Sequence, residues 1–253
     1  MSGGCSIPHY YYIPNVQNVP LFNKSDEFTG LAAFSSGLVD NCAEFQAGYS
    51  FTGHVALIAN YMTGGNNHST QTYEDFSKLH YFEGALGYYK SFSNIGVFEV
   101  YGGYGQGSQH HAFSYTEFYG WTTWTTVSDG KADMSFSKIF IQPDIGIKTK
   151  WADAAFSCRL TRINFNEIAI YGTTYHLDEL NLLQLNNTDW LIEPAITFRA
   201  GFEPVKFHLQ FVFSRNLTNS DLLFEKFRIN LGLQISLSKK QSESNPQLTF
   251  RDK

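Results

Sequence analysis

The sequence is poor in charge, and it has no apolar run long enough for a transmembrane helix. Only 16% of its 253 residues are charged, compared with about 25% in a typical soluble domain. No run of 18 or more apolar residues occurs, so the sequence predicts no membrane-spanning helix. The formal net charge is −5. Without a basic stripe, we expect no nucleic-acid partner.

Cysteine is scarce as well. Cys5, Cys42 and Cys158 show neither the spacing of a zinc site nor a CxxC motif. His68 and the pair at 110–111 have no third ligand at a fixed spacing. We therefore expect no metal and no cofactor.

Aromatic residues, by contrast, are abundant. They make up 17% of the chain, with 23 Phe and 15 Tyr. Low charge and many aromatics, without a helix-length apolar run, form the profile expected of a transmembrane β-barrel, because alternation along each strand dilutes its hydrophobic signal.

The clearest strand runs from Phe227 to Leu237. Its odd positions are all large and apolar, and its even positions are polar or glycine. Successive side chains of a strand point to opposite faces, so one face of this segment is apolar and the other polar. Its length matches the roughly 9–11 residues that a tilted strand needs to cross a bilayer.

Similar segments recur along the chain and predict an all-β fold, an antiparallel up-and-down transmembrane β-barrel of about ten strands, within a range of about eight to twelve. The expected strands are 27–37, 42–51, 54–63, 79–92, 95–107, 133–148, 152–165, 189–202, 205–216 and 225–238. A weak helical period at 175–187 suggests a short helix within a loop.

The connections between these strands are asymmetric. Four are tight turns, near residues 51–54, 93–96, 149–153 and 203–205. Three of the others are long, at about 64–78, 108–132 and 166–188. Outer-membrane barrels show this asymmetry, with short periplasmic turns and long extracellular loops. We therefore expect the outer membrane as the location, with the long loops extracellular and both termini periplasmic.

Charged side chains occupy one phase of most strands, opposite the apolar phase. The pattern alone does not say which phase faces inward, because a soluble barrel would show it too. Strand length, loop asymmetry and tyrosines near strand ends favour lipid outside. The inward charges would then be five acids and five bases: Glu44, Glu83, Glu99, Lys138, Asp144, Arg159, Glu193, Arg199, Lys206 and Arg228. The tyrosines assigned to the strand ends are Tyr49, Tyr61, Tyr81, Tyr88 and Tyr104.

Two interpretations of this lumen charge network remain open. Ten strands enclose a narrow lumen, and buried charges there must pair and hydrogen-bond. The balanced charges indicate a salt-bridged interior that keeps the barrel rigid, or else a path for small polar solutes. Glu83 and Glu99, on adjacent strands, could also form an acid pair for proton transfer. With five bases nearby we favour structural pairing and expect no enzyme.

An aromatic segment in the longest predicted loop is the candidate for recognition. It contains Tyr115, Phe118, Tyr119, Trp121 and Trp124. Exposed aromatic patches tend to mark binding surfaces. The alternative is a hairpin that extends the flanking strands and pairs its aromatics across the strands.

The two ends of the chain lie outside the strand pattern. We expect residues 1–26 to be a periplasmic tail, residues 27–238 the barrel, and residues 239–253 a second periplasmic tail. Cys5 follows small residues, as at the end of a bacterial lipoprotein signal, although the upstream leucine is missing. We weigh lipidation of Cys5 against an ordinary free thiol.

Several short motifs together resemble a known group of proteins. They are Asn18-Val19-Pro20-Leu21-Phe22 after the cysteine-led tail, Phe140-Ile141-Gln142-Pro143-Asp144-Ile145-Gly146, Ala154-Ala155-Phe156-Ser157, and Glu193-Pro194-Ala195 followed by Arg199-Ala200-Gly201. The chain is similar to small outer-membrane β-barrel proteins of Bacteroidota, some of them lipidated.

That resemblance implies a barrel that acts alone or as an accessory subunit of an envelope complex, and it transfers no catalytic residue. The expected partners are outer-membrane lipid or lipopolysaccharide and other outer-membrane proteins or lipoproteins. A structural or binding role comes first, a narrow channel for small polar solutes second, and a barrel enzyme acting on lipid or peptide third.

Overall fold

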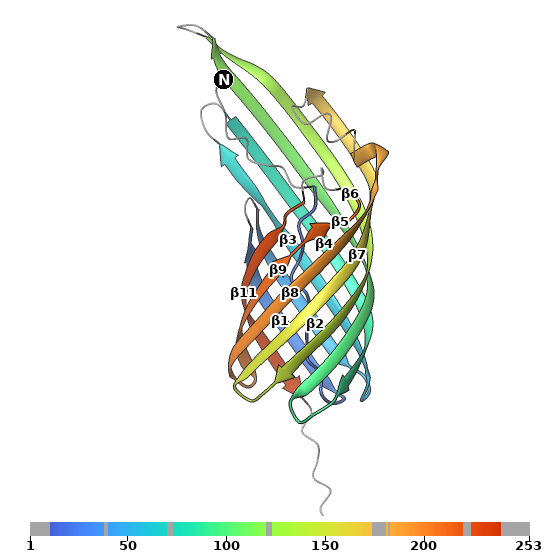
Figure 1. Cartoon of the computed structure of the whole chain (residues 1–253). Helices are drawn as coiled ribbons and strands as arrows, with labels where there is room; N and C mark the ends of the chain where they lie inside the picture. Colours follow the sequence, from blue (N-terminus) through green and yellow to red (C-terminus); the bar gives the residue numbers. More distant parts are fainter. Residues whose placement is uncertain are drawn as a thin grey trace, which may run out of the picture.

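The computed structural model describes residues 11–37, 40–69, 73–119, 123–173, 181, 183–219 and 224–238, and it shows a closed antiparallel barrel of ten long strands (Figure 1). The strands are β1 Glu27–Ser36, β2 Asn41–Ser50, β3 Val55–Ser69, β4 Tyr73–Ser91, β5 Gly96–Tyr119, β6 Thr123–Lys148, β7 Ala152–Thr173, β8 Thr188–Phe202, β9 Val205–Phe213 and β11 Phe227–Ser238. A two-residue strand, β10 Arg215–Asn216, continues β9 along β8.

Each strand pairs with its neighbour in the chain, and the barrel closes where β1 pairs with β11. Glu27 lies opposite Ser238 and Ser36 opposite Ile229 across this seam. The predicted fold class and all ten predicted strands are therefore confirmed. Around the barrel itself each strand is paired on both sides, which is the condition for a sheet in lipid. Beyond it, among the described residues, Asn66–Ser69 of β3 and Glu167–Thr173 of β7 pair on one side only.

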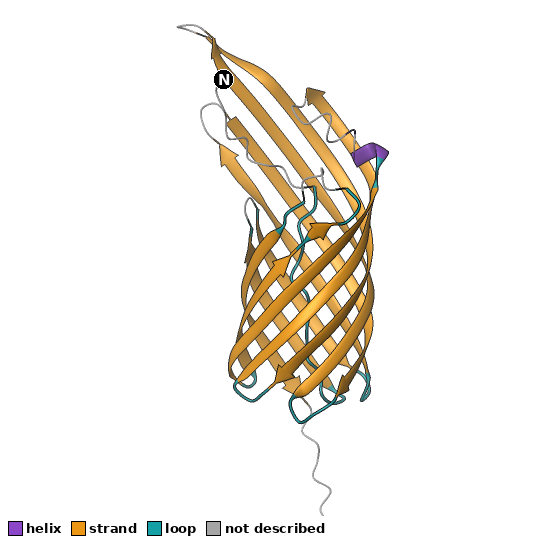
Figure 2. Cartoon of the chain, viewed as in Figure 1, coloured by secondary structure: helices purple, strands orange, loops and turns teal. Residues whose placement is uncertain are grey.

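Two of the predicted long loops, 64–78 and 108–132, are instead largely strand, and in the third, 166–188, β7 continues to Thr173. β5 and β6 contain 24 and 26 residues, more than twice what a bilayer crossing needs. The hairpins β3–β4 and β5–β6 therefore continue beyond the barrel as a one-sided extension, at the top of Figure 2. The end of β7 continues with them, paired with the start of β6. The predicted helix at 175–187 is reduced, among the described residues, to residues 181 and 183–185.

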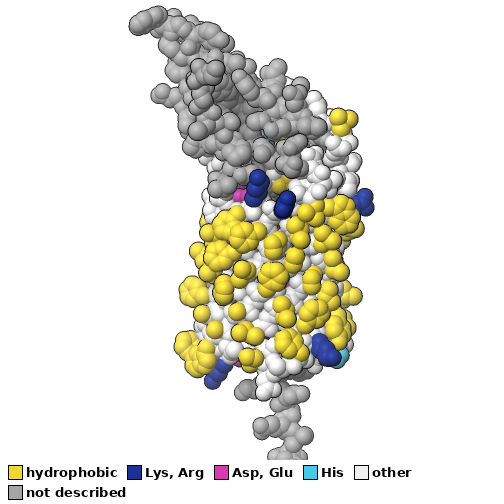
Figure 3. Space-filling view, in the orientation of Figure 1, with side chains coloured by type: hydrophobic (Ala, Val, Ile, Leu, Met, Phe, Trp, Pro, Cys, Tyr) yellow, Lys and Arg dark blue, Asp and Glu magenta, His cyan; other side chains and the backbone are white. Residues whose placement is uncertain are grey.

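The outer surface of the barrel is apolar. Large side chains such as Leu86, Phe207 and Leu231 are each more than half exposed. Figure 3 shows hydrophobic side chains spread over the face of the barrel in view, with lysine and arginine at the borders of this apolar zone. Exposed aromatics gather near the tight turns, among them Tyr49, Phe51, Tyr88 and Trp151. Tyr81 corrects one expectation, since it is buried in the interior rather than placed in this girdle.

No helix in the described part of the chain is both long and apolar enough to span a bilayer.

Candidate functional site

The interior of the barrel, called the lumen below, is filled by the chain's own N-terminal segment. All twelve residues from Tyr11 to Phe22, which form the N-terminal segment, are buried. In Figure 1 this segment runs as a thin coil inside the strands. An extended stretch of this length reaches roughly 40 Å, more than the hydrocarbon thickness of a bilayer, about 30 Å.

Within the expected periplasmic tail at residues 1–26, this position corrects the prediction for residues 11–22, which lie inside the barrel. Tyr11 and Tyr12 belong to an apolar cluster that includes Leu79 and Phe165, at the end of the lumen that faces the long hairpins. Asn23 lies at the opposite end, where its backbone N–H donates to Glu27 Oε2 at 3.1 Å. The described chain therefore passes through the lumen before β1 begins. Residues 1–10, with Cys5, and residues 239–253 lie outside the described residues.

Near the long-hairpin end, the wall holds its charges in a compact cluster around Glu83. The guanidinium of Arg159 lies 3.1 Å from Glu83 Oε1, and Lys138 Nζ lies 3.3 Å from Oε2. The carboxylate also accepts hydrogen bonds from the Tyr81 hydroxyl and the Asn60 amide. Opposite charges in direct contact, each with further hydrogen bonds, are the arrangement that makes buried ions tolerable.

The N-terminal segment takes part in this cluster through side chains. Asn15 Nδ2 donates to Glu83 Oε1 at 2.9 Å, while Asn15 Oδ1 accepts from Lys138 Nζ at 3.0 Å and from Arg159 at 2.9 Å. The Tyr12 hydroxyl accepts from Lys138 at 3.0 Å and donates to Glu193 at 3.0 Å. One amide and one phenol thus bridge the acids and bases of the wall.

Further along, the wall contacts the backbone of the segment instead. Glu99 accepts the N–H groups of Leu21 and Phe22, at 3.0 and 2.8 Å. Glu44 accepts the N–H of Val16 at 2.7 Å. The guanidinium of Arg199 donates to the carbonyl of Val19.

Three glutamines of the wall add neutral contacts of the same kind. Gln210 makes a reciprocal pair with the backbone of Gln17, at 2.8 and 2.9 Å. Gln142 and Gln46 donate to the carbonyls of Asn18 and Val16, each at 2.9 Å. Five wall strands, β2, β5, β6, β8 and β9, thus supply side chains that bind the segment's backbone.

The ten residues of the expected lumen charge network are all buried, each at most 4% exposed. Only part of the set pairs internally, in the cluster around Glu83. Lys206 instead contacts Asp153 at 2.7 Å, and Arg228 contacts Glu225 at 2.5 Å. Neither acid was among the predicted residues.

The described interior is also more acidic than predicted. Ten acidic side chains and five basic ones are buried in the described part of the chain. The five acids beyond the predicted set are Glu27, Asp40, Asp153, Asp189 and Glu225. Several of them lie at strand ends or in connections, where alternation does not report which way a side chain points.

Glu83 and Glu99 do not form an acid pair. Glu83 lies opposite Gly105 in the β4–β5 register, and Glu99 lies opposite Tyr89. Six residues therefore separate them along the strands, roughly 20 Å at the usual strand rise. Nor do any three potential ligands cluster as a metal site in the part of the chain that the structure describes.

The predicted recognition loop belongs to the β5–β6 hairpin. Tyr115, Phe118 and Tyr119 lie in β5 and Trp124 in β6, with Phe118 opposite Trp124 in the register. Trp121 lies outside the described residues. The backbone therefore follows the hairpin alternative, and a binding role for these aromatics stays a prediction.

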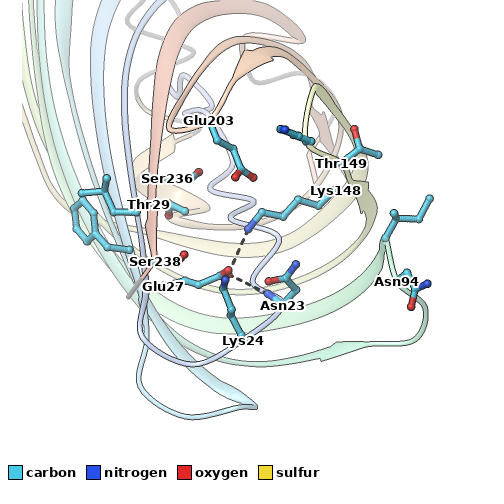
Figure 4. A pocket seen from close by; sticks show the side chains of 14 residues that line it. Asn23, Lys24, Glu27, Thr29, Asn94, Lys148, Thr149, Glu203, Ser236 and Ser238 are labelled. Atoms are coloured by element: carbon cyan, nitrogen blue, oxygen red, sulfur yellow. Dashed lines mark hydrogen bonds and ion pairs between the residues drawn. The ribbon is translucent and has the colours of Figure 1, made fainter. Parts of the chain in front are cut away.

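A pocket of about 450 Å³ opens at the tight-turn end. Figure 4 shows Lys148 reaching across it to Glu27, which also accepts the backbone N–H of Asn23. Lys24 and Glu203 lie on its lining. The size would suit a small ligand, but the pocket's charges of both signs select no ligand class.

The role of residues 11–22 was missed because the segment lacks periodicity and carries two prolines. One signal was present: residues 1–23 contain no Asp, Glu, Lys or Arg. A solvated tail is usually rich in charge, whereas an uncharged stretch with amide side chains suits a narrow polar interior.

Comparison with solved structures finds outer-membrane barrels at very low identity. The translocator domain of the autotransporter NalP from Neisseria meningitidis is 7% identical, with a TM-score of 0.49, over 84% of this chain and 89% of that one. The COG4313 outer membrane channel from Pseudomonas putida F1 is 11% identical, with a TM-score of 0.44, over 87% and 100%. LpxR from Salmonella typhimurium is 9% identical, with a TM-score of 0.36, over 82% and 99%.

No protein-family model and no curated protein matches the sequence. Likenesses of this extent transfer no activity to the chain.

Proposed function

We propose that this chain is a bacterial outer-membrane barrel whose lumen is closed by its own N-terminal segment, and that its role is structural or binding. The observation that carries the proposal is the burial of residues 11–22 along the lumen, inside a wall with an apolar exterior. An apolar outside, a polar inside and closed pairing together meet the requirements of a lipid bilayer.

Electrical recording tests closure. The full chain, refolded and inserted into a planar bilayer, is expected to show no steady single-channel current. Glu44→Gln combined with Glu99→Gln removes the two carboxylates that hold the segment's N–H groups, so brief openings are expected in that variant. Glu203→Gln, a change of the same kind in an exposed turn, serves as the matched control.

A steady current through the unaltered chain would overturn the closed-lumen proposal. It would support the second candidate, a narrow channel for small polar solutes. The feature that favours this candidate is the excess of buried acids in the described interior, which predicts selectivity for cations.

We assign no enzymatic activity to the chain. The oxygens of Glu83 are occupied by Lys138 and Arg159, and those of Glu99 by two backbone N–H groups. Carboxylates engaged in this way are poor candidates for proton transfer. A lipid- or peptide-acting barrel enzyme therefore ranks third.

The binding role is assigned to the long hairpins, which we place on the extracellular side. Their aromatic tip contains Tyr115, Phe118, Tyr119, Trp121 and Trp124. An accessory subunit of an envelope complex is expected to co-purify with its partner in mild detergent. A Phe118→Ser, Trp124→Ser double variant should lose that partner while folding normally, and recovery of a clean monomer from the unaltered chain would contradict the subunit role.

Lipidation of Cys5 is a separate part of the proposal. Mass spectrometry of the N-terminal peptide is expected to show a diacyl or triacyl mass on Cys5. An unmodified thiol there would contradict it.

A further inference from the structure

We infer that the lumen is a receptor for an extended, uncharged polypeptide that binds in one direction, and that residues 11–22 are its resident ligand, held without need of their covalent link to β1. The inference rests on the closed-lumen proposal above and names the chemistry of what closes it.

The backbone pairing of the wall is complete without the segment. Its ten strands satisfy one another's backbone groups around the closed ring. Between the described segment and the wall, the only backbone-to-backbone contact is at Tyr12, which forms an isolated bridge with Phe224 and accepts from Glu225 N–H at 3.1 Å. The other wall contacts described above come from wall side chains, as in a protein that binds a separate peptide.

Direction is fixed by the order of donors and acceptors. Glu44 Oε2 and both oxygens of Glu99 accept N–H groups, while the Arg199 guanidinium can only donate and needs an acceptor such as a carbonyl. The segment meets these needs with Val16 N–H, with Leu21 and Phe22 N–H, and with the Val19 carbonyl. A chain entering in the opposite sense would not present these groups at the same positions.

The wall also leaves room for particular side chains. A Cβ at Gly48 would lie 2.8 Å from Thr29 Oγ1 and 3.1 Å from the Phe22 ring. One at Gly146 would lie 2.8 Å from Leu21 and equally close to Ala154 and Ala155 of the wall, so both the wall and the segment need glycine there. The Phe22 ring packs on Tyr89, with centroids 5.7 Å apart. These fits make the lumen selective for apolar side chains at its tight-turn end.

Charge sets a further limit on the ligand. The segment has no ionised side chain, and the described wall has more buried acids than bases. An acidic peptide would place like charges together at low dielectric, so it is excluded.

The full chain allows a direct test. Residues 23–26 are exposed, so a site for a specific protease can be inserted there and cut after the barrel has folded. The cut sample is then incubated with a fluorescent synthetic peptide of residues 10–24, and barrel-bound label is measured after gel filtration. A peptide of reversed sequence has the same composition and serves as the control.

The expected result is that the cut segment stays with the barrel and is replaced by the labelled peptide, but not by the reversed one. N-methylation of Leu21 and Phe22 in the peptide should weaken binding at least about tenfold, because it removes hydrogen bonds to a buried carboxylate.

Three results would overturn the inference. They are unfolding of the barrel on cutting, retention of the cut segment without exchange, and equal binding of the reversed peptide. The conductance measurement addresses closure and the exchange measurement addresses ligand character, so either can fail without the other.

Discussion

Two regions of the lumen satisfy buried acids in different ways. Around Glu83, two cations from the wall lie within 3.3 Å of the carboxylate, and the N-terminal segment adds only side-chain contacts. Among the described residues no cation forms an ion pair with Glu99, and both of its carboxylate oxygens accept backbone N–H groups of the segment. The first region holds the wall together, and the second holds the segment to the wall.

The largest effect is expected from breaking the Glu83 cluster. Arg159→Met removes one of the two cations and leaves buried charge uncompensated, which should lower the free energy of unfolding by about 3–5 kcal/mol. Urea unfolding in detergent micelles, followed by tryptophan fluorescence, measures it. Arg162→Met is the matched control, since Arg162 lies on the same strand with its side chain exposed. Equal losses of unfolding free energy in the two variants would show that the Glu83 cluster stabilises the fold no more than an exposed arginine does.

A smaller effect is expected at Glu99. Glu99→Gln replaces one carboxylate oxygen with an NH2 group, which cannot accept a hydrogen bond, so one backbone N–H of the segment loses its partner. The expected loss is about 1–3 kcal/mol, together with faster proteolysis at Lys24 as the segment loosens. Glu203→Gln in an exposed turn should change neither quantity. A loss as large as that of Arg159→Met would mean that the two regions do not differ as described.

The smallest effect is the coupling between the two regions. Because roughly 20 Å of strand separates Glu83 from Glu99, Glu83→Gln and Glu99→Gln should add to within about 0.5 kcal/mol. Glu83→Gln and Arg159→Met, which change contacting residues, should depart from additivity by about 0.5–3 kcal/mol. Strong coupling between the two glutamates would indicate a single network along the lumen.

Much of the barrel could be predicted because the membrane imposes a period of two. Phe227 to Leu237 alternates strictly, and β11 follows it with the odd positions from Ile229 to Leu237 exposed and most even positions buried or partly buried. The same rule placed Arg159 and Arg228 inside. Beyond the bilayer the constraint ends: residues such as Asn66 and Asn67 are polar on both faces, so the extended hairpins resembled loops.

The partners of the interior charges were harder to predict. Asp153 is at the second position of its strand and Glu225 lies in a connection, so neither belongs to a long alternating run. The contacts of Glu99 depend on the backbone of a segment 77 residues away in the chain. No local pattern encodes a hydrogen bond of that kind.

The seam between β1 and β11 sets a requirement on the order of assembly. The N-terminal segment leads directly into β1, and β1 is the strand on which the last strand docks. Pairing that joins residues about two hundred positions apart forms slowly. The first residues of the chain therefore have time to lie against the growing wall, and the ring can close around them as its template rather than having to admit them afterwards.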